Sequence, residues 1–512
     1  MTSTLTLLRG GLVADGEKSS LYRADVLLQD DRIASVGVIT PTTEMHVREL
    51  PAGSVVLPGF IDMHVHGEPL IVSGGAVLPD LHQGVTTVVL GHDGMSWIGS
   101  APQSAAYLTQ YFGAVNGDAP EGGCTVREFA ASIREHLIQN VVSLASQGTI
   151  RHGVAGDSAA PLDAEETARI QTAVERAMED GARGISSGLD YIPSRFSDAT
   201  EMAAFMAPVA AASGTYFSHL RAYGSGLRSG LDEMRTVSAL SGVRAHVSHL
   251  WADQGTASKA LTLLDDWSSP VSFDLYPYTR ASSLLAMFLL PAAWQSQGTS
   301  ATLTHIQKAS TEAELEAHIE GNNIDLSAVT LATVPHKREH LAGMTLTDAA
   351  RSLDERATRL ALDLLIEGNL SVGAHIARAG ISIADVDFLL KHPDATGGSD
   401  GIYVGQSPHP RGWGSFTEIC LRYLAADADD GLARAAAALA ARPARTLGLR
   451  DRGVIAPGRA ADLVVLDPAQ LAAPATYENP RANAAGVTAV YVNGRCVVDD
   501  GAVTGAVPGR HL

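Results

Sequence analysis

Short apolar runs separated by amphipathic stretches recur through the middle of the chain, between about residues 58 and 411. Eight of these runs have the length and composition of buried strands. They are 60–66, 86–91, 140–146, 182–187, 215–219, 243–249, 270–276 and 394–400. Helical patterns lie between them, for example at 164–179, 199–212 and 256–267. Strands that regularly alternate with helices predict a parallel sheet, and eight such units predict an α/β fold of the (β/α)8, TIM-barrel type.

The gap between the seventh and eighth runs is far longer than the others. It predicts an insertion at about 285–350, placed to cover a site at the strand ends as a lid. Both ends of the chain show short alternating runs and turns instead, and we expect them to form one small β-sandwich together. The predicted domains are 1–57, the first part of the sandwich; 58–413, the barrel; and 414–512, a C-terminal helix and the rest of the sandwich.

Composition limits the classes of partner. The 512 residues are 46% hydrophobic, enough for one large core and a second smaller one. The net charge of −19 disfavours nucleic acids and anionic membrane surfaces. No apolar segment approaches the roughly 18 residues that a spanning helix needs. We therefore expect a cytoplasmic protein that acts on a small molecule, and nothing in the sequence sets its oligomeric state.

Four histidines close predicted strands. His64 and His66 are two residues apart on the first run, so they point to the same face. His219 and His249 close the fifth and sixth runs, which lie side by side in a barrel. Each histidine alone is compatible with a hydrogen-bonded core residue. Four of them at matching strand ends predict a metal site.

Asp400 closes the eighth run, in Gly-Gly-Ser-Asp-Gly. Imidazole and carboxylate donors without thiolate suit zinc, and also manganese, iron, cobalt or nickel. Three widely spaced cysteines, Cys124, Cys420 and Cys496, indicate neither a disulfide framework nor a thiolate site. Beside a divalent ion, Asp400 suits the role of general base and acid, which contributes roughly 10²- to 10⁴-fold in rate. The alternative for this residue is a helix cap.

These residues together resemble the amidohydrolase superfamily, whose hallmarks are matched by 59–66, the two single histidines, Asp400 and 457–464. Within the superfamily the chain is similar to the N-acyl-D-amino-acid deacylases, also called D-aminoacylases. The segments that carry this similarity are 84–88, 184–191, 218–221, 274–278 and 409–416. The resemblance implies that a metal-dependent enzyme removes the acyl group from an N-acyl-D-amino acid.

The resemblance also implies a set of substrate-binding residues. Arg411 would hold the α-carboxylate, for which a guanidinium fork is chemically suited. Tyr191 and Tyr278 would line the pocket, and Ser283 would assist. The alternatives are surface charge for the arginine and ordinary aromatic packing for the tyrosines.

The chain departs from the family pattern at three places: 146–148, where Gly-His-Gly is common, and two positions that affect ligands or substrate. Where relatives carry a metal-bridging cysteine after the second strand, this chain has Gly-His-Asp-Gly, so the ligand role passes to Asp93, with His92 as a rival. Where relatives carry a carboxylate-binding lysine, this chain has Trp251. Either Arg280 replaces that cation, or the pocket accepts a bulkier or less anionic substrate.

We expect two unequal metal positions. The tight one is predicted at Asp93, His219 and His249, and the weaker one at His64, His66 and Asp400. Two other functions compete with D-amino acid deacylation. One is hydrolysis of a different amide, whether cyclic, carbamoyl or peptide-like, which Trp251 favours. The other is a barrel that has lost catalysis and serves as a scaffold, against which the retained histidines and Asp400 argue.

Overall fold

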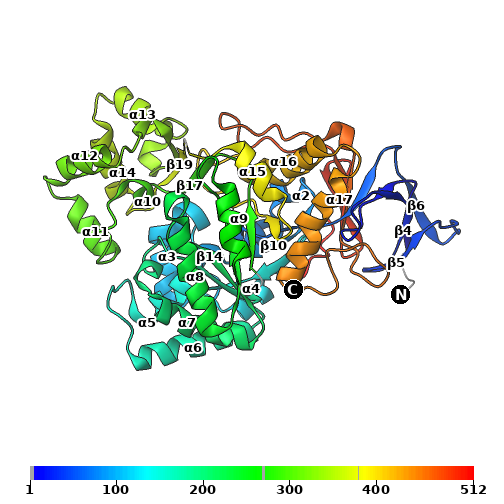
Figure 1. Cartoon of the computed structure of the whole chain (residues 1–512), viewed down its shortest axis with the longest axis horizontal. Helices are drawn as coiled ribbons and strands as arrows, with labels where there is room; N and C mark the ends of the chain where they lie inside the picture. The colour runs from blue at the N-terminus through cyan, green and yellow to red at the C-terminus, as the bar shows by residue number, and fades with distance from the viewer. Residues whose placement is uncertain (1–4, 268–270, 379) are drawn as a thin grey trace.

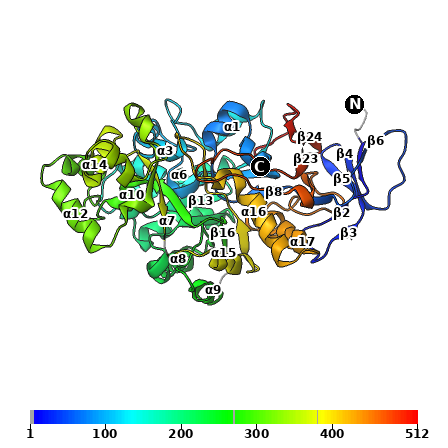
Figure 2. The same cartoon turned by 90° about the horizontal axis from the view of Figure 1, so that it is seen from above.

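The computed structural model describes residues 5–267, 271–378 and 380–512. The molecule is elongated, with a β-rich end built from both termini, a central α/β body and a largely helical insertion at the opposite end (Figures 1 and 2). Residues 1–4 and Pro270, which belong to the predicted sandwich and the predicted seventh strand, lie outside the described residues.

Parallel strands follow one another through the central body in chain order. They are β8 (Phe60–Asp62), β10 (Val85–Leu90), β11 (Asn140–Ser143) continued by β12 (Ala145–Ser146), β13 (Gly184–Gly188), β14 (Thr215–His219), β15 (Arg244–Val247), β16 (Val271–Leu275) and β20 (Ala395–Gly397). Met63 N donates to Gly397 O at 3.2 Å, which joins the last strand to the first. Next to this bond, β9 (Val65–His66) pairs in parallel with β21 (Gly401–Ile402). Each predicted run therefore contains a strand.

Helices pack around these strands, so the strands are buried on both faces. The helices are α1 (Glu68–Gly74), α2 (Leu78–Leu81), α3 (Pro102–Asn116), α4 (Val126–Ile133), α5 (Gln147–Ala155), α6 (Ala164–Glu179), α7 (Ala199–Ala211), α8 (Leu227–Ser241), α9 (Ala257–Asp265), α15 (Ile383–Leu390) and α16 (Arg411–Ala426). All six residues of β10 are buried, and five of them are β-branched valines or threonines, which suit a strand covered on both faces. α6 has the predicted bounds, and a capping box between Asp163 and Glu166 fixes its start.

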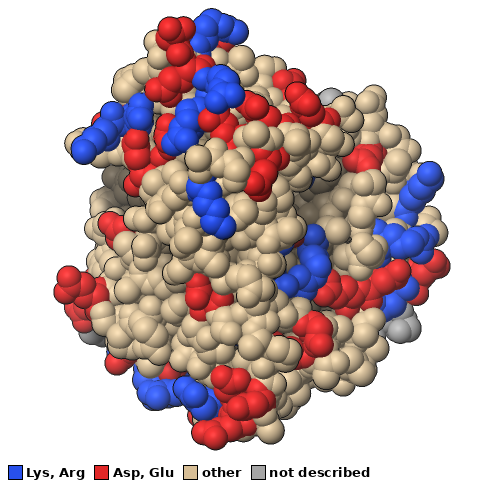
Figure 3. Space-filling model, turned by 90° about the vertical axis from the view of Figure 1, so that its left-hand side faces the viewer, with Lys and Arg blue, Asp and Glu red and all other residues tan. Residues whose placement is uncertain are grey.

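The insertion between β16 and β20 is longer than the predicted 285–350. Its strands β17 (Arg280–Leu284), β18 (Val329–Thr333) and β19 (Gly373–Ala377) form an antiparallel sheet, and its helices are α10 (Leu285–Leu289), α11 (Thr299–Ile306), α12 (Thr311–Gly321), α13 (Leu346–Ser352) and α14 (Ala357–Glu367). β17 precedes the predicted start of the insertion and β19 follows its predicted end. Both strands belong to the insertion because they pair with each other. On the side of the molecule that carries the insertion, acidic and basic side chains form mixed clusters and no continuous basic surface (Figure 3).

Strands from both termini share one seven-stranded sheet, ordered β25-β24-β23-β22-β7-β2-β3. It combines β2 (Leu12–Val13), β3 (Tyr22–Arg23) and β7 (Val55–Pro58) with β22 (Leu463–Leu466), β23 (Val487–Val492), β24 (Arg495–Asp499) and β25 (Ala502–Val503). A second sheet contains β1 (Leu5–Arg9), β4 (Asp25–Gln29), β5 (Arg32–Gly37) and β6 (Met45–Glu49). Asn493 and Gly494, both with positive φ, form the hairpin turn between β23 and β24.

The alanine-rich stretch after α16 is helical and consists of α17 (Gly431–Ala436), a π-helical turn (Ala437–Ala441) and α18 (Arg442–Thr446). The three cysteines are free. Across the described ranges, no helix combines the length and hydropathy needed to cross a membrane.

A buried polar network joins the terminal β-sheet to the central body. Arg452 forms an ion pair with Asp462, and its Nη2 donates to Asn493 Oδ1 at 2.9 Å. Asp462 also accepts from Asn493 N at 2.7 Å and from Asn140 Nδ2, in β11, at 3.1 Å. All four residues are buried. Asp462 lies in the 457–464 segment of the family resemblance, so part of that motif connects the terminal β-sheet to the central body.

The network predicts that Arg452→Met destabilises the protein by about 3–5 kcal/mol, because it leaves the Asp462 carboxylate buried without its counter-charge. Arg9→Met is the matched control, since the Arg9–Glu49 pair is exposed and such pairs contribute at most about 1 kcal/mol. Urea unfolding followed by tryptophan fluorescence measures both. Equal losses in the two variants would show that the buried network does not stabilise the joint.

Candidate metal centre

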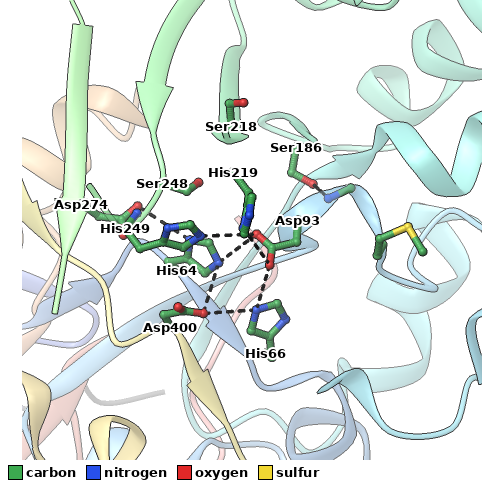
Figure 4. Close-up of polar contacts among 12 residues, drawn as sticks. His64, His66, Asp93, Ser186, Ser218, His219, Ser248, His249, Asp274 and Asp400 are labelled. Atoms are coloured by element: carbon green, nitrogen blue, oxygen red, sulfur yellow. Dashed lines mark hydrogen bonds and ion pairs between the residues drawn. The ribbon is translucent and has the colours of Figure 1, made fainter. Parts of the chain in front are cut away.

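Six buried side chains converge at the carboxyl ends of the central strands (Figure 4). Each was predicted from the sequence as a metal ligand. His66 lies in β9, with His64 just before it, and His219 ends β14. Asp93, His249 and Asp400 lie in the loops that follow β10, β15 and β20. The strand-end positions in the sequence thus correspond to one cluster in space.

Asp93 lies at the centre of this cluster. Its Oδ1 is 3.5 Å from His64 Nε2 and 3.9 Å from His249 Nε2. Its Oδ2 is 3.7 Å from His66 Nε2 and 3.8 Å from His219 Nδ1. The two oxygens of one carboxylate therefore face all four histidines. Asp400 Oδ1 closes the group, 3.7 Å from His64 Nε2 and 3.5 Å from His66 Nε2.

These separations are too long for good hydrogen bonds but match the spacing of ligands around one ion. Donor atoms about 2.0–2.2 Å from a tetrahedral zinc lie about 3.3–3.6 Å apart. Both ring nitrogens of His64, Asp93 Oδ1 and His219 Nδ1 are buried without a hydrogen-bond partner. Buried polar atoms are rarely left unpaired, so these donors fit a bound cation.

Two groups of three side chains bring single donor atoms within 4.8 Å of one another. One is His64, His66 and Asp400, the set predicted for the weaker ion. The other is His64, Asp93 and His249, whereas the tight ion was predicted at Asp93 with His219 and His249. His64 belongs to both groups because its Nε2 points between Asp93 and Asp400.

Three of the six residues have left-handed backbone conformations. The φ angles are 57° at Asp93, 35° at His249 and 49° at Asp400. Such angles are unfavourable for residues other than glycine and persist where surrounding contacts enforce them. Asp400 N donates to His64 O at 2.7 Å, and His249 N donates to Asp274 Oδ1 at 2.9 Å. These bonds hold the loops in the turn that directs the side chains inward.

A further layer of polar residues orients the histidines. Asp274, at the end of β16, contacts His246 Nε2 at 3.0 Å and lies 3.8 Å from His64 Nδ1. His66 Nδ1 contacts Asn116 Oδ1 at 2.7 Å, and His219 Nε2 contacts Asp190 Oδ2 at 3.4 Å. Metal-ligating histidines usually have such partners on the other ring nitrogen. This layer was not predicted from the sequence, although Asp274 lies in the predicted seventh strand.

The electrostatics of His249, Asp93 and Asp400 favour the protonation states that bind a cation. For His64 and His219, burial lowers the pKa but neighbouring carboxylates, Asp274 and Asp190 first, outweigh it and raise the pKa. Burial lowers the pKa of His249 to about 3, so its ring is neutral and keeps a lone pair. Burial raises the pKa of Asp93, but the surrounding histidines, His219 first, outweigh it and hold the pKa well below the usual range. For Asp400, burial is opposed by the charge of Arg411 and by His66, and the pKa is again lowered. Both carboxylates are therefore ionised at neutral pH.

His92, the rival to Asp93, lies behind the cluster. Its ring stacks on His64 with the centroids 3.9 Å apart. Both of its ring nitrogens are buried without a hydrogen-bond partner, and neither belongs to the two ligand groups. Asp93 rather than His92 faces the other ligands.

The cluster opens into a narrow cavity of about 50 Å³. Three of the predicted substrate-binding residues line it, namely Tyr191, Ser283 and Trp251. The Tyr191 hydroxyl lies 2.5 Å from Ser283 Oγ. Trp251 stacks on Tyr223, with ring centroids 5.9 Å apart. Aromatic rings therefore form much of the wall next to the metal ligands.

Three other expectations need correction. Tyr278 is absent from the described cavity wall and packs against His409, while Tyr276 lines the cavity, because the chain leaves the strand at Leu275. Arg411, at the start of α16, is fully buried and its Nη1 lies 2.7 Å from Asp400 Oδ2. Arg280 lies over the ring of Tyr477, outside the described cavity wall. Neither arginine is among the described residues that line the cavity.

A buried cluster of imidazoles and carboxylates at strand ends, open to a cavity, defines a metal-dependent hydrolase. Comparison with known sequences agrees with this class. The sequence profile of the amidohydrolase family matches residues 52–498, and the chain belongs to that family.

Full-length relatives are deacylases. The chain is 30% identical to an N-acyl-D-glutamate deacylase of Alcaligenes xylosoxydans xylosoxydans over 99% of this chain and 96% of the relative. It is 29% identical to a D-aminoacylase of the same organism, over 99% and 97%. Among solved structures, the N-acyl-D-glutamate deacylase of Bordetella bronchiseptica, complexed with zinc and a phosphonate mimic of the tetrahedral intermediate, is 27% identical over 99% of both chains, with a TM-score of 0.84. A D-aminoacylase studied for its binuclear metal centre is 28% identical over 99% of both chains, with a TM-score of 0.83.

The position of Asp93 predicts that Asp93→Asn lowers zinc affinity by more than the roughly 10- to 100-fold that outer-layer changes cause. His92→Phe should retain zinc, because it keeps a ring against His64 and removes only the two nitrogens. Zinc content and competition with a chelator measure both variants. Loss of zinc in His92→Phe with retention in Asp93→Asn would reverse the assignment.

Proposed function

We propose that the chain is a zinc-dependent deacylase of N-acyl-D-amino acids. The observation that carries the proposal is the Asp93-centred cluster, in which buried donor atoms without hydrogen-bond partners adjoin a cavity. The full-length similarity to deacylases of N-acyl-D-amino acids supports the choice of substrate class.

We propose a tight ion at Asp93, His219 and His249 and a weaker one at His64, His66 and Asp400. The two oxygens of Asp93, which face different histidines, support a carboxylate shared between the positions. A bound divalent ion would polarise the amide carbonyl and make water a stronger acid. The other roles in the reaction are assigned to side chains of the protein.

Asp400 is the proposed general base. Its Oδ1 faces the cluster, while Oδ2 is held by Arg411. It takes a proton from the water whose oxygen attacks the amide carbonyl carbon. When the carbon–nitrogen bond breaks, the same carboxyl group returns the proton to the leaving amine. Arg411 is therefore a positioning residue that keeps Asp400 ionised and oriented.

Tyr191 and Ser283 are the proposed orienting groups for the substrate, since their hydroxyls lie together on the cavity wall.

The eight strands are proposed to close into a barrel, which the Met63–Gly397 bond supports.

The insertion is proposed to act as a lid. Met287 and Phe288 of α10 line the cavity, whose 50 Å³ is far below the several hundred Å³ of typical ligand pockets. Entry of a substrate therefore needs the insertion to move.

A second candidate is hydrolysis of a different amide, such as an N-carbamoyl or cyclic compound. Trp251 favours it, because a flat aromatic face in the wall suits a planar group as well as an amino acid. A panel of N-acetyl, N-formyl and N-carbamoyl derivatives of D- and L-amino acids separates the two candidates.

With zinc bound, N-acyl-D-amino acids should be hydrolysed in preference to their L-enantiomers. Asp400→Asn should lower kcat by about 10²- to 10⁴-fold, since it removes the proton acceptor. Asp265→Asn, at an exposed carboxylate on α9, is the control and should leave kcat unchanged. Inactivity on every D-substrate would refute the substrate class, and wild-type kcat in Asp400→Asn would refute the mechanism.

A further inference from the structure

The cavity wall carries two charged side chains besides the predicted metal ligands, Asp190 and Arg378. Asp190 has a role in the cluster, because its Oδ2 contacts His219 Nε2. Arg378 is the only lysine or arginine among the described residues that line the cavity. Its charge is not explained by the metal centre.

Arg378 comes from the insertion and not from the central strands. It directly follows β19, and Gln254 N donates to Gly380 O at 2.5 Å, which ties this segment to the loop after β15. Trp251 belongs to the same loop. The Arg378 guanidinium lies 4.3 Å from the centre of the Trp251 ring. The insertion thus places a cation on the aromatic side chain that stands where a lysine was expected.

Trp251 is itself held firmly. Its other neighbour is Tyr223, whose ring is nearly parallel to it, with 15° between the planes. The Tyr223 hydroxyl accepts from Leu220 N at 2.9 Å and donates to Ser248 O at 3.0 Å. Arg378 therefore rests on a stack that is anchored to the backbone beside His219 and His249.

The Arg378 guanidinium has no hydrogen bond or ion pair with any other residue in the described part of the chain. Arg411, by contrast, is paired with Asp400. Burial also lowers the pKa of Arg378, which means that its surroundings disfavour the charge. A guanidinium with free donors on the wall of a narrow cavity is a ready partner for a carboxylate, which it binds through two parallel hydrogen bonds.

We propose that Arg378 binds a carboxylate of the substrate and that Trp251 positions it for this contact. The inference rests on the proposed deacylase function and gives this chain a carboxylate-binding residue different from Arg411. It also changes the interpretation of Trp251. The tryptophan does not remove the cation from this wall but holds one that the insertion supplies.

Two pairs of substrates test this inference and separate the possible sources of the carboxylate. N-acetyl-D-alanine and its carboxamide differ only in the α-carboxylate, while N-acetyl-D-glutamate and N-acetyl-D-glutamine differ only in the side chain. The wild-type protein should prefer the acid in at least one pair by about 10- to 100-fold in kcat/KM, the usual size of a charged hydrogen bond. In Arg378→Gln that preference should fall towards one, through KM of the acid, with the neutral partner unchanged.

The pair that loses its preference identifies the source. Loss of the preference in the alanine pair shows that Arg378 binds the α-carboxylate. Loss of the preference in the glutamate pair shows that it binds the side-chain carboxylate. Arg235→Gln is the matched control, because the Arg235 guanidinium also stacks on a tryptophan, Trp267, at 5.4 Å but lies outside the cavity wall. Unchanged preferences in Arg378→Gln would overturn the inference.

Failure of the proposed function gives a different result, since the wild-type protein would then hydrolyse none of the four compounds. In that case calorimetric titration of the zinc-loaded wild-type and Arg378→Gln proteins with N-acetyl-D-alanine and N-acetyl-D-glutamate measures binding alone. At least one acid should bind about 10- to 100-fold more weakly to the variant. Equal affinities for both acids, or no binding to either protein, would overturn the role of Arg378.

Discussion

The site depends on one buried carboxylate, Asp93, whose oxygens face four imidazoles. Removing an ionised carboxylate from water is costly unless cations or hydrogen-bond donors replace the solvent. Asp93 Oδ1 has no hydrogen-bond donor within reach, and neither ring nitrogen of His64 has a partner. A divalent ion bound between these atoms would give both Asp93 and His64 the partner that each lacks. Without it, the cluster would be a concentration of unpaired polar atoms in the middle of the protein.

Much of the surrounding structure holds this cluster together. The left-handed turns at Asp93, His249 and Asp400 direct three side chains from separate loops to one point, and bonds such as Asp400 N to His64 O keep the turns in place. Asp274 connects the sixth and seventh strands to His64. Arg411 reaches Asp400 from the start of α16. The rigid strands thus fix where each loop begins. Hydrogen bonds and ion pairs from the surrounding residues then fix where its side chain lies.

The sequence predicted the strands and five of the six converging side chains because both follow local rules, whereas Asp93 was inferred from the family resemblance. Continuous apolar runs indicate strands buried on both faces, and a polar residue at the end of each run lies at one edge of a parallel sheet. The predictions that failed concern residues outside the central strands, whose positions local rules do not determine. The family resemblance implied Tyr278, but the strand ends at Leu275 and Tyr276 lines the cavity. Arg411 and Arg378 depend on how α16 and the insertion dock, which the spacing of residues does not determine. The shared position of His64 likewise needs three-dimensional distances.

Extended X-ray absorption at the zinc K-edge tests the Asp93-centred site most directly. The protein is reconstituted with one equivalent of zinc, and the first coordination shell is measured. A site built from Asp93 and the histidines predicts only nitrogen and oxygen at about 2.0–2.2 Å, with the outer scattering of imidazole rings. A sulfur shell near about 2.3 Å, or a shell without imidazole, would contradict it.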